Sequence, residues 1–220
     1  MAVSGVNGRR RAYDNAGRIE QAAANRRRVL AAAHRVLVER GYAATTINAI
    51  AAEARVSREM IYKAFGNKLA LVKRLYDIQL IGDDEERPLG DRPEWAAMMA
   101  ELTAGGVLLR YATIVRELYE RLGALLGVLL LAARSGEPDL ASFGAETDRQ
   151  RLVGAGRVID AVVERGGLRA GVDRRQAIDI VWTLNSPDVY QLLRGGRGWS
   201  HDEYEDWLAR SLIDALVERR

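Results

Sequence analysis

The sequence predicts an all-α protein with a small N-terminal domain, which holds a helix-turn-helix, and a larger helical C-terminal domain. Apolar residues recur at helical spacing along most of the chain, and no convincing segment alternates apolar and polar residues as a strand does. Only four of the 220 residues are proline, and the 21 glycines lie mostly between helical segments. The segment 82–93, GDDEERPLGDRP, gathers acid, glycine and proline, so we expect the domains at 19–81 and 82–220.

The N-terminal segment changes character near residue 19. Residues 1–18 are rich in glycine and arginine and lack an apolar period, so we expect a flexible basic arm there. A first helix is predicted from about Glu20 or Asn25 to Arg40, and Gly41 supplies its stop.

The segment 45–65, TTINAIAAEARVSREMIYKAF, predicts two short helices joined by a tight turn. The first has its apolar residues at the i, i+3, i+4, i+7 spacing of one buried face, with Thr45 before it as the N-cap. Ser57 can cap the second helix, whose Ile61 is directed inward. The residues then directed outward or to the flanks are Arg58, Glu59, Met60, Tyr62 and Lys63. A helix pair of this kind is what a helix-turn-helix needs to enter the major groove of DNA.

The remaining helices follow from caps and from glycine or proline breaks. Asn67 is predicted to cap a fourth helix that runs to about Ile81, and Gly105-Gly106 is expected to loosen or break the next segment. The predicted C-terminal helices cover 94–104, 107–134, about 139–165, 173–185, the short segment 188–193, and a last helix from about His201.

Charge and composition narrow the function. The net charge of +3 divides into +9 for residues 1–80 and −6 for residues 81–220, which suits one domain facing phosphate, although chance clustering on solvated faces is the alternative. The absence of cysteine excludes disulfides, thiolate catalysis and cysteine-based metal sites. The start lacks the apolar core of a signal peptide, and the longest apolar run, 124–133, is too short to span a membrane. We therefore expect a cytoplasmic protein.

Residues 26–76 resemble the TetR family of bacterial transcriptional regulators. The positions that carry the resemblance are Gly41-Tyr42, Thr45-Thr46, Ile50-Ala51, Val56-Ser57, Ile61-Tyr62, Phe65, Lys68 and Leu71. The resemblance implies a homodimer that binds a pseudo-palindromic double-stranded DNA operator, and a repressor that a small-molecule effector releases. Three residues depart from the family pattern: Arg55 stands where glycine is usual, Glu59 where a small residue is usual, and Ala64 where His or Tyr usually touches a phosphate.

The candidate site residues fall in three groups. For DNA binding they are Thr45, Thr46, Ser57, Arg58, Glu59, Met60, Tyr62, Lys63 and Lys68. Arg58 suits guanine and Glu59 cytosine N4, although Glu59 can instead pair with Arg58 or Lys63 on the surface. For the effector pocket they are Trp95, Met98, Met99, Leu102, Tyr111, Leu118, Trp182 and Asn185, for each of which ordinary core packing is the alternative. For a dimer interface made by the last helix with 173–185 they are Trp207, Leu208, Leu212 and Leu216.

Two other classes of protein compete with this interpretation. A sequence-tolerant architectural protein would bind all DNA with similar affinity. An enzyme is the less favoured alternative, because His34 and His201 are too far apart in sequence to suggest a metal pair and neither lies beside a nucleophile motif. The fragment Gly154-Ala155-Gly156 does not follow a strand, and the acids at 83–86 are adjacent in a linker. We therefore predict no catalytic residue, no metal site and no cofactor.

Overall fold

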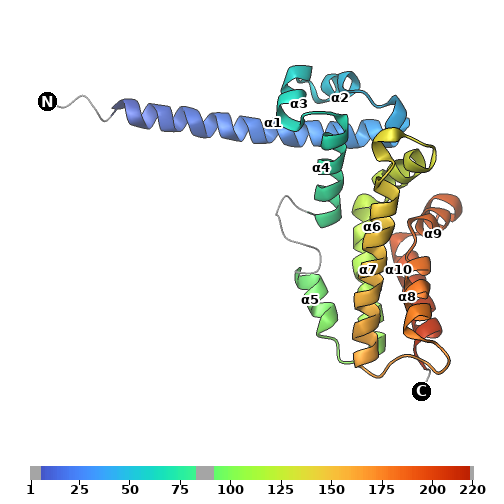
Figure 1. The fold of residues 1–220 in the computed structure, drawn as a ribbon. Coiled ribbons are helices and arrows are strands. Elements are labelled where there is room, and N and C mark those ends of the chain that lie inside the picture. Colours follow the sequence, from blue (N-terminus) through green and yellow to red (C-terminus); the bar gives the residue numbers. More distant parts are fainter. Residues whose placement is uncertain (1–5, 83–91, 219–220) are drawn as a thin grey trace. The chain divides into compact units, whose positions relative to one another are not determined.

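A computed structural model of the chain describes residues 6–82 and 92–218, and every regular element in these ranges is helical (Figure 1). The chain divides into two compact units, Met1–Leu75 and Tyr76–Arg220. The division falls inside the fourth helix rather than in the acidic segment that follows it. Leu75 is the last residue of the first unit, whereas the ring of Tyr76 packs edge-on against Phe143, with 5.0 Å between centroids.

The first unit consists of α1 (Val6–Ala44), α2 (Ile47–Ala54), α3 (Arg58–Phe65) and the first part of α4 (Lys68–Ile81). Helical geometry in α1 is interrupted at Gly41, whose φ of 76° is open to glycine at no steric cost, so the predicted stop is confirmed. The fully buried side chains are those that helical periodicity directs inward, including Val29, Ala33, Val36, Leu37, Ile50, Ile61, Leu71 and Val72.

The predicted flexible arm is wrong for most of its length, because α1 is helical from Val6. Residues 1–5 lie outside the described part of the chain. Extending a helix that already exists avoids the cost of nucleation, and residues 6–18 contain no proline to stop it. Residues 6–18, which lack an apolar face, therefore extend the packed part of α1 toward the N-terminus.

The second unit is organised around one long helix. The described elements after α4 are α5 (Pro93–Met99), α6 (Ala104–Arg134), a 3₁₀ turn η2 (Pro138–Leu140), α7 (Phe143–Glu164), α8 (Arg174–Leu184), α9 (Pro187–Gln191), a π-helical turn η3 (Leu192–Gly196) and α10 (His201–Leu216). The central helix, α6, packs against α5, α7, α9 and α10, and α8 packs against α7 and α10. None of the described helices combines the length and apolarity needed to cross a membrane.

Side-chain caps fix where these helices begin. The capping boxes of Asp173 with Gln176 and of Ser200 with Glu203 start α8 and α10, close to the predicted positions. The predicted break at Gly105-Gly106 is wrong, because the Thr103 hydroxyl accepts from the Gly106 N–H at 3.0 Å and places both glycines in the first turn of α6. Helix α7 starts later than predicted, since the residues after Pro138 form η2 instead.

Candidate DNA-binding surface and effector cavity

Helices α2 and α3 are held by two caps and a left-handed turn. The Thr46 hydroxyl accepts from the Ala49 N–H at 3.1 Å, and the Ser57 hydroxyl accepts from the Met60 N–H at 3.2 Å. Between them Arg55 has φ 54° and ψ 50°, and it is the one non-glycine residue with positive φ in the ranges that the structure describes. The turn that glycine usually makes in such a motif is thus made here by an arginine under strain.

Thr45 does not have the role that was predicted for it. The N-cap of α2 is Thr46, one residue later, and the Thr45 side chain is 1% exposed. Its hydroxyl donates to the Gly41 carbonyl at 2.7 Å, and so bonds the backbone where α1 is interrupted. A buried hydroxyl needs such a partner, and Thr45 is therefore not available at the surface.

Helix α3 presents a chemically mixed outer face. Ile61 is buried, whereas Arg58, Glu59, Tyr62 and Lys63 are exposed, and Met60 is 36% exposed. The Arg58 and Glu59 side chains approach within 4.0 Å, a loose pair between two exposed groups. Hydrogen bonds from its own backbone N–H and from Ser57 lower the pKa of Glu59, so this side chain is a carboxylate at neutral pH. The exposed face of α3 therefore carries two cations, one carboxylate, one aromatic ring and one thioether.

The cations that flank α3 hold backbone groups. Arg26 donates to the Ala64 carbonyl and Arg28 to the Arg55 carbonyl, each at 3.3 Å, so both secure the C-terminal ends of α2 and α3 to α1. Lys68 donates to a carbonyl at 3.2 Å and its Nζ lies 3.9 Å from the centroid of the Tyr42 ring. An ammonium group has three donors, so Lys68 keeps capacity for a phosphate.

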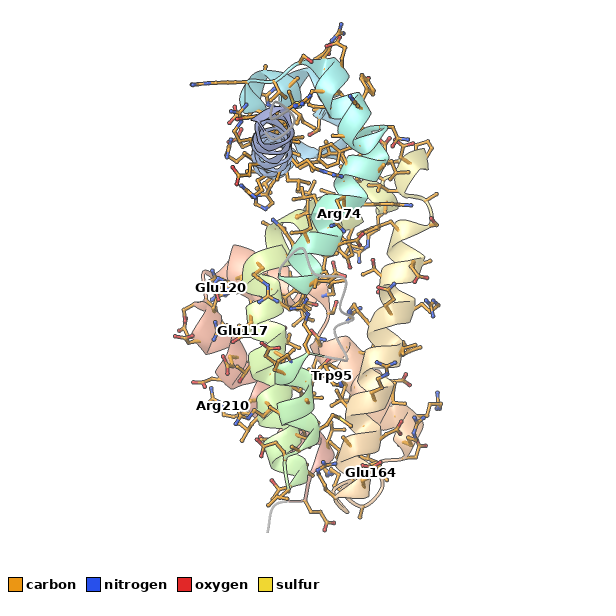
Figure 2. All side chains as sticks on the ribbon, turned by 90° about the vertical axis from the view of Figure 1, so that its left-hand side faces the viewer. Arg74, Trp95, Glu117, Glu120, Glu164 and Arg210 are labelled. Atoms are coloured by element: carbon orange, nitrogen blue, oxygen red, sulfur yellow. The ribbon has the colours of Figure 1, made fainter. Side chains whose placement is uncertain are left out.

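A cavity of about 500 Å³ lies within the second unit. Its wall comes from the last turns of α4, from α5, α6 and α7, and from Asn185 after α8. Figure 2 shows Trp95 between the green helices, α5 and α6, and helix α7. The lining residues are Tyr76, Leu80, Ile81, Trp95, Tyr111, Ile114, Val115, Leu118, Tyr119, Leu122, Leu126, Thr147, Arg149, Gln150, Arg151, Val153, Gly154, Arg157 and Asn185.

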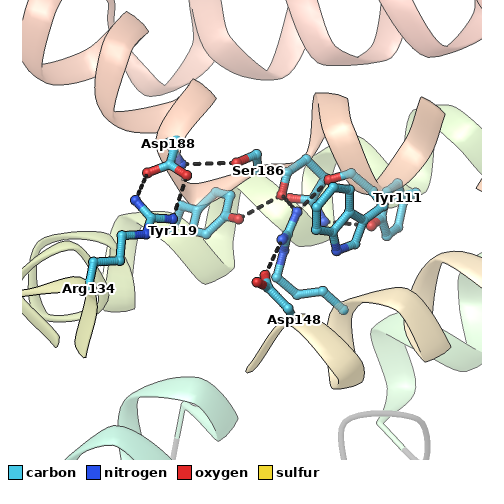
Figure 3. Close-up of polar contacts among 9 residues, drawn as sticks. Tyr111, Tyr119, Arg134, Asp148, Ser186 and Asp188 are labelled. Atoms are coloured by element: carbon cyan, nitrogen blue, oxygen red, sulfur yellow. Dashed lines mark hydrogen bonds and ion pairs between the residues drawn. The ribbon is translucent and has the colours of Figure 1, made fainter. Parts of the chain in front are cut away.

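A polar network joins several residues of the cavity wall (Figure 3). The Asn185 amide donates to the Tyr111 hydroxyl at 2.6 Å, while the Asn185 main-chain oxygen accepts from Tyr119 and from Arg151, both at 2.8 Å. Burial raises the pKa of Tyr111 to about 12, so its phenol stays neutral. Asn185 Oδ1 is buried and has no hydrogen-bond partner in the described part of the chain. The cavity wall therefore contains an acceptor that remains open.

Comparison with known proteins identifies the N-terminal motif. Residues 29–75 match the family model described as bacterial regulatory proteins, tetR family. The chain is also 26% identical over 185 residues to the uncharacterized HTH-type transcriptional regulator YdeS of Bacillus subtilis (strain 168), with 84% of each protein covered. The chain thus carries a tetR-family DNA-binding domain at residues 29–75. It is a DNA-binding transcriptional regulator, and α2 and α3 are its helix-turn-helix.

Two solved structures share the fold of this chain. The transcriptional regulator FadR from Bacillus subtilis, in complex with stearoyl-CoA, has a TM-score of 0.64 at 18% identity, covering 86% of this chain and 97% of FadR. NalD, the secondary repressor of the MexAB-OprM multidrug efflux pump in Pseudomonas aeruginosa, has a TM-score of 0.64 at 20% identity, covering 91% of this chain and 100% of NalD. At these identities the likeness shows the fold.

Only half of the predicted effector residues line the cavity. Trp95, Tyr111, Leu118 and Asn185 do so. The other four lie elsewhere: Met98 is fully buried, Met99 and Leu102 are 37% and 91% exposed, and the Trp182 ring lies against the Arg151 guanidinium. Met99 ends α5 and Leu102 lies in the connection from α5 to α6, which Arg165 holds by donating to the carbonyls of Met99 and Glu101.

The α7 side of the cavity was missed by the sequence analysis. The α7 residues concerned follow a helical stripe: Thr147, Gln150, Arg151, Gly154 and Arg157. Polar and small residues at this spacing are typical of a solvated helix face, so periodicity alone assigns them to the outside. One feature of the sequence could have indicated that α7 contributes to a binding site, namely the number of arginines that this helix carries in an otherwise acidic domain.

The predicted dimer residues are mostly buried inside the protomer. Leu208, Leu212 and Leu216 are fully buried within the protomer, where α10 packs against α6 and α8. Trp207 is half-buried and its ring packs edge-on against Trp199. An amphipathic helix buries its strongest apolar stripe in its own domain first, so that stripe is not free for a second copy.

Proposed function

We propose that this tetR-family regulator is a cytoplasmic, sequence-specific homodimeric repressor, and that a small-molecule effector releases it from a pseudo-palindromic operator. The observation that carries the proposal is the pairing of an exposed, chemically mixed α3 with a cavity in the other unit. Two proteins of the same fold support it, since NalD is named as a repressor and FadR was solved with stearoyl-CoA. The function is binding and release rather than catalysis.

Base recognition is assigned to the exposed end of α3. The Arg58 guanidinium can fork onto guanine O6 and N7, and the Glu59 carboxylate can accept from cytosine N4. Met60, which is partly exposed, suits contact with a thymine methyl group. Ser57 acts here through its cap, which fixes the first turn of α3 and thereby the direction of Arg58.

Phosphate contacts are assigned to four exposed or half-exposed side chains around α3: Thr46, Tyr62, Lys63 and Lys68. Such contacts position the protein on the duplex and make binding depend on salt, but they carry no sequence information directly. Ala64, at the position where the family usually has His or Tyr, supplies no such contact.

Self-association is assigned to the outer faces of α8 and α10. There Ile180, Trp207 and Ile213 remain half-buried in the protomer, and a second copy would cover them. A twofold dimer matches the symmetry of a pseudo-palindromic site.

Release follows from linkage between the cavity and the DNA. An effector that prefers the conformation unable to bind the operator weakens operator binding by its differential affinity for the two conformations. Helix α4 is the element through which this coupling acts in our proposal. Its Leu75 belongs to the first unit, and its Tyr76 and Leu80 belong to the cavity wall.

The test of base recognition compares two variants on the operator selected from genomic fragments. Arg58→Ala should weaken operator binding by about 1–3 kcal/mol and relax specificity at one base pair of each half-site. Lys63→Ala, which removes another exposed cation from the same helix, should weaken binding to operator and random DNA alike. Fluorescence anisotropy on operator duplexes with single base-pair changes distinguishes the two. Equal loss on every duplex for Arg58→Ala would contradict the assigned role.

A further inference from the structure

We propose that the effector is an amphipathic anion, an apolar chain or ring system with one negatively charged group, and that Arg157 binds this group. The proposal rests on the proposed effector site and specifies the chemical class of its ligand. It follows from three features of the cavity: the composition of its wall, the balance of charges along α7, and the open acceptor of Asn185.

Most of the cavity wall is apolar. Aliphatic side chains from α4 and α6 form much of it: Leu80, Ile81, Ile114, Leu118, Leu122 and Leu126. A volume of about 500 Å³ is within the range of pockets that enclose drug-sized ligands. The body of the ligand must therefore be apolar, because a polar body would lose its hydration against these side chains without compensation.

The charged residues of the wall are all basic. Among the described residues that line the cavity, three are arginines on α7 and none is a carboxylate. Arg149 is neutralised by both oxygens of Glu146, at 2.7 and 2.9 Å, and Arg151 by Asp148 at 3.0 Å. Two of the three positive charges are thus already balanced from outside the cavity.

Arg157 is the cation that remains. Its side chain is exposed, and it has no hydrogen bond or ion pair with any residue that the structure describes. Asp160, which follows it by nearly one helical turn, is not available, since its two oxygens are bound by Arg174 at 2.7 and 3.0 Å. The α7 side therefore carries one unbalanced positive charge beside an apolar cavity, which favours a ligand with one negative charge.

A second, smaller cavity, lined from α4, α5 and α6, shows no such imbalance of charge. This cavity of about 240 Å³ shares Trp95 and Leu118 with the first, and its charged lining residues are Arg92, Arg121, Glu94 and Glu117. Two cations and two carboxylates favour neither sign of ligand charge. The anionic group is therefore assigned to the α7 side.

Asn185 Oδ1 adds an independent indication of a ligand. A buried acceptor without a partner is costly in a folded protein, and this one belongs to a residue of the cavity wall. A hydroxyl or N–H group of a ligand would supply the missing bond. An amphipathic anion that also carries such a donor should consequently bind more tightly than one without it.

The test measures binding to the full-length protein without DNA. The fluorescent probe 8-anilino-1-naphthalenesulfonate is titrated first, and then displaced by decanoate, 1-decanol or decyltrimethylammonium, which share a ten-carbon chain and differ in charge. Decanoate should displace the probe at least about fivefold more effectively than decanol, with the cation weakest, because a charge-assisted hydrogen bond is stronger than a neutral one.

Three variants locate the interaction. Arg157→Gln should reduce decanoate binding about fivefold and leave decanol unchanged, whereas Arg197→Gln, which removes an exposed arginine away from the cavity, should change neither. Leu118→Trp, which fills the cavity, should weaken the probe and all competitors.

Each contrary result has its own meaning. Equal binding of decanoate and decanol, or an unaffected Arg157→Gln variant, would overturn the assignment of an anion. Probe binding that survives Leu118→Trp would place the ligand elsewhere and overturn it as well. If decanoate binds through Arg157 but leaves operator affinity unchanged, the anion-binding site is supported and release by such an effector is refuted.

Discussion

Replacing Arg55 with glycine should stabilise the turn between α2 and α3. The backbone of Arg55 is left-handed, with φ 54° and ψ 50°, and its side chain is exposed. The substitution removes the Cβ that strains this conformation and keeps the backbone hydrogen bonds of the residue. These include the bond from its N–H to the Ala52 carbonyl at 3.2 Å and the bond from Arg28 to its own carbonyl at 3.3 Å.

The expected gain is the difference between two opposing effects. A left-handed conformation costs an L-residue about 1–2 kcal/mol. Glycine loses more backbone entropy on folding, which offsets about 0.5–1 kcal/mol of that relief. The balance leaves about 0.5–1 kcal/mol in favour of Arg55→Gly, equivalent to about a two- to fivefold change in a local opening equilibrium.

Hydrogen exchange of the amides of α2 and α3 measures this opening directly. Exchange should slow about two- to fivefold in Arg55→Gly. The matched variant Arg55→Ala retains Cβ and the strained φ, so it should exchange like the parent protein. Faster exchange in the glycine variant, or an alanine variant that gains as much protection as the glycine variant, would refute the argument that Cβ strain sets the stability of this turn.

Two further predictions concern buried or half-buried groups. Tyr119→Phe should lower the free energy of unfolding by about 0.5–1.5 kcal/mol, because the Asn185 carbonyl keeps its bond from Arg151, whereas Tyr111→Phe strands the Asn185 amide and should cost about 1–3 kcal/mol; equal losses in urea unfolding would contradict this. Burial lowers the pKa of His34 in the folded protein below 6.5, its value in the unfolded chain. Between the folded and the unfolded pKa the unfolded chain binds more protons, so the free energy of unfolding decreases as the pH falls through this range. His34→Gln should flatten the pH dependence of urea unfolding there, and an unchanged slope would contradict the assignment.

Helix boundaries were predictable where a cap and an apolar face agree. Ser57, Asp173 and Ser200 each cap the helix that follows, and all three helices begin close to where the sequence places them. The pair Thr45-Thr46 offered two possible caps, and only the packing of Thr45 against the end of α1 decides between them. Local rules of this kind therefore fix a helix start to within a residue or two.

The cavity and the dimer face were less predictable, because periodicity tells which side of a helix is buried but not what covers it. The sequence identified Tyr111 and Leu118 as candidate residues of the effector pocket, and both line the cavity from α6. Arg157 on α7 also lines it, but its position in the sequence follows the pattern of a solvated helix face. Leu212 shows the converse, since its apolar stripe is buried by its own domain rather than by a second copy. Such distinctions depend on tertiary packing.

The most direct test of sequence-specific regulation is a selection of genomic DNA fragments on the purified protein, repeated over a series of salt concentrations. We predict recovery of one short inverted repeat, bound several orders of magnitude more tightly than random DNA, with half-sites about 34–36 Å apart or at a multiple of that spacing. Equal binding of all fragments, fading together as salt rises, would contradict the proposal and indicate a protein that recognises only the phosphate backbone.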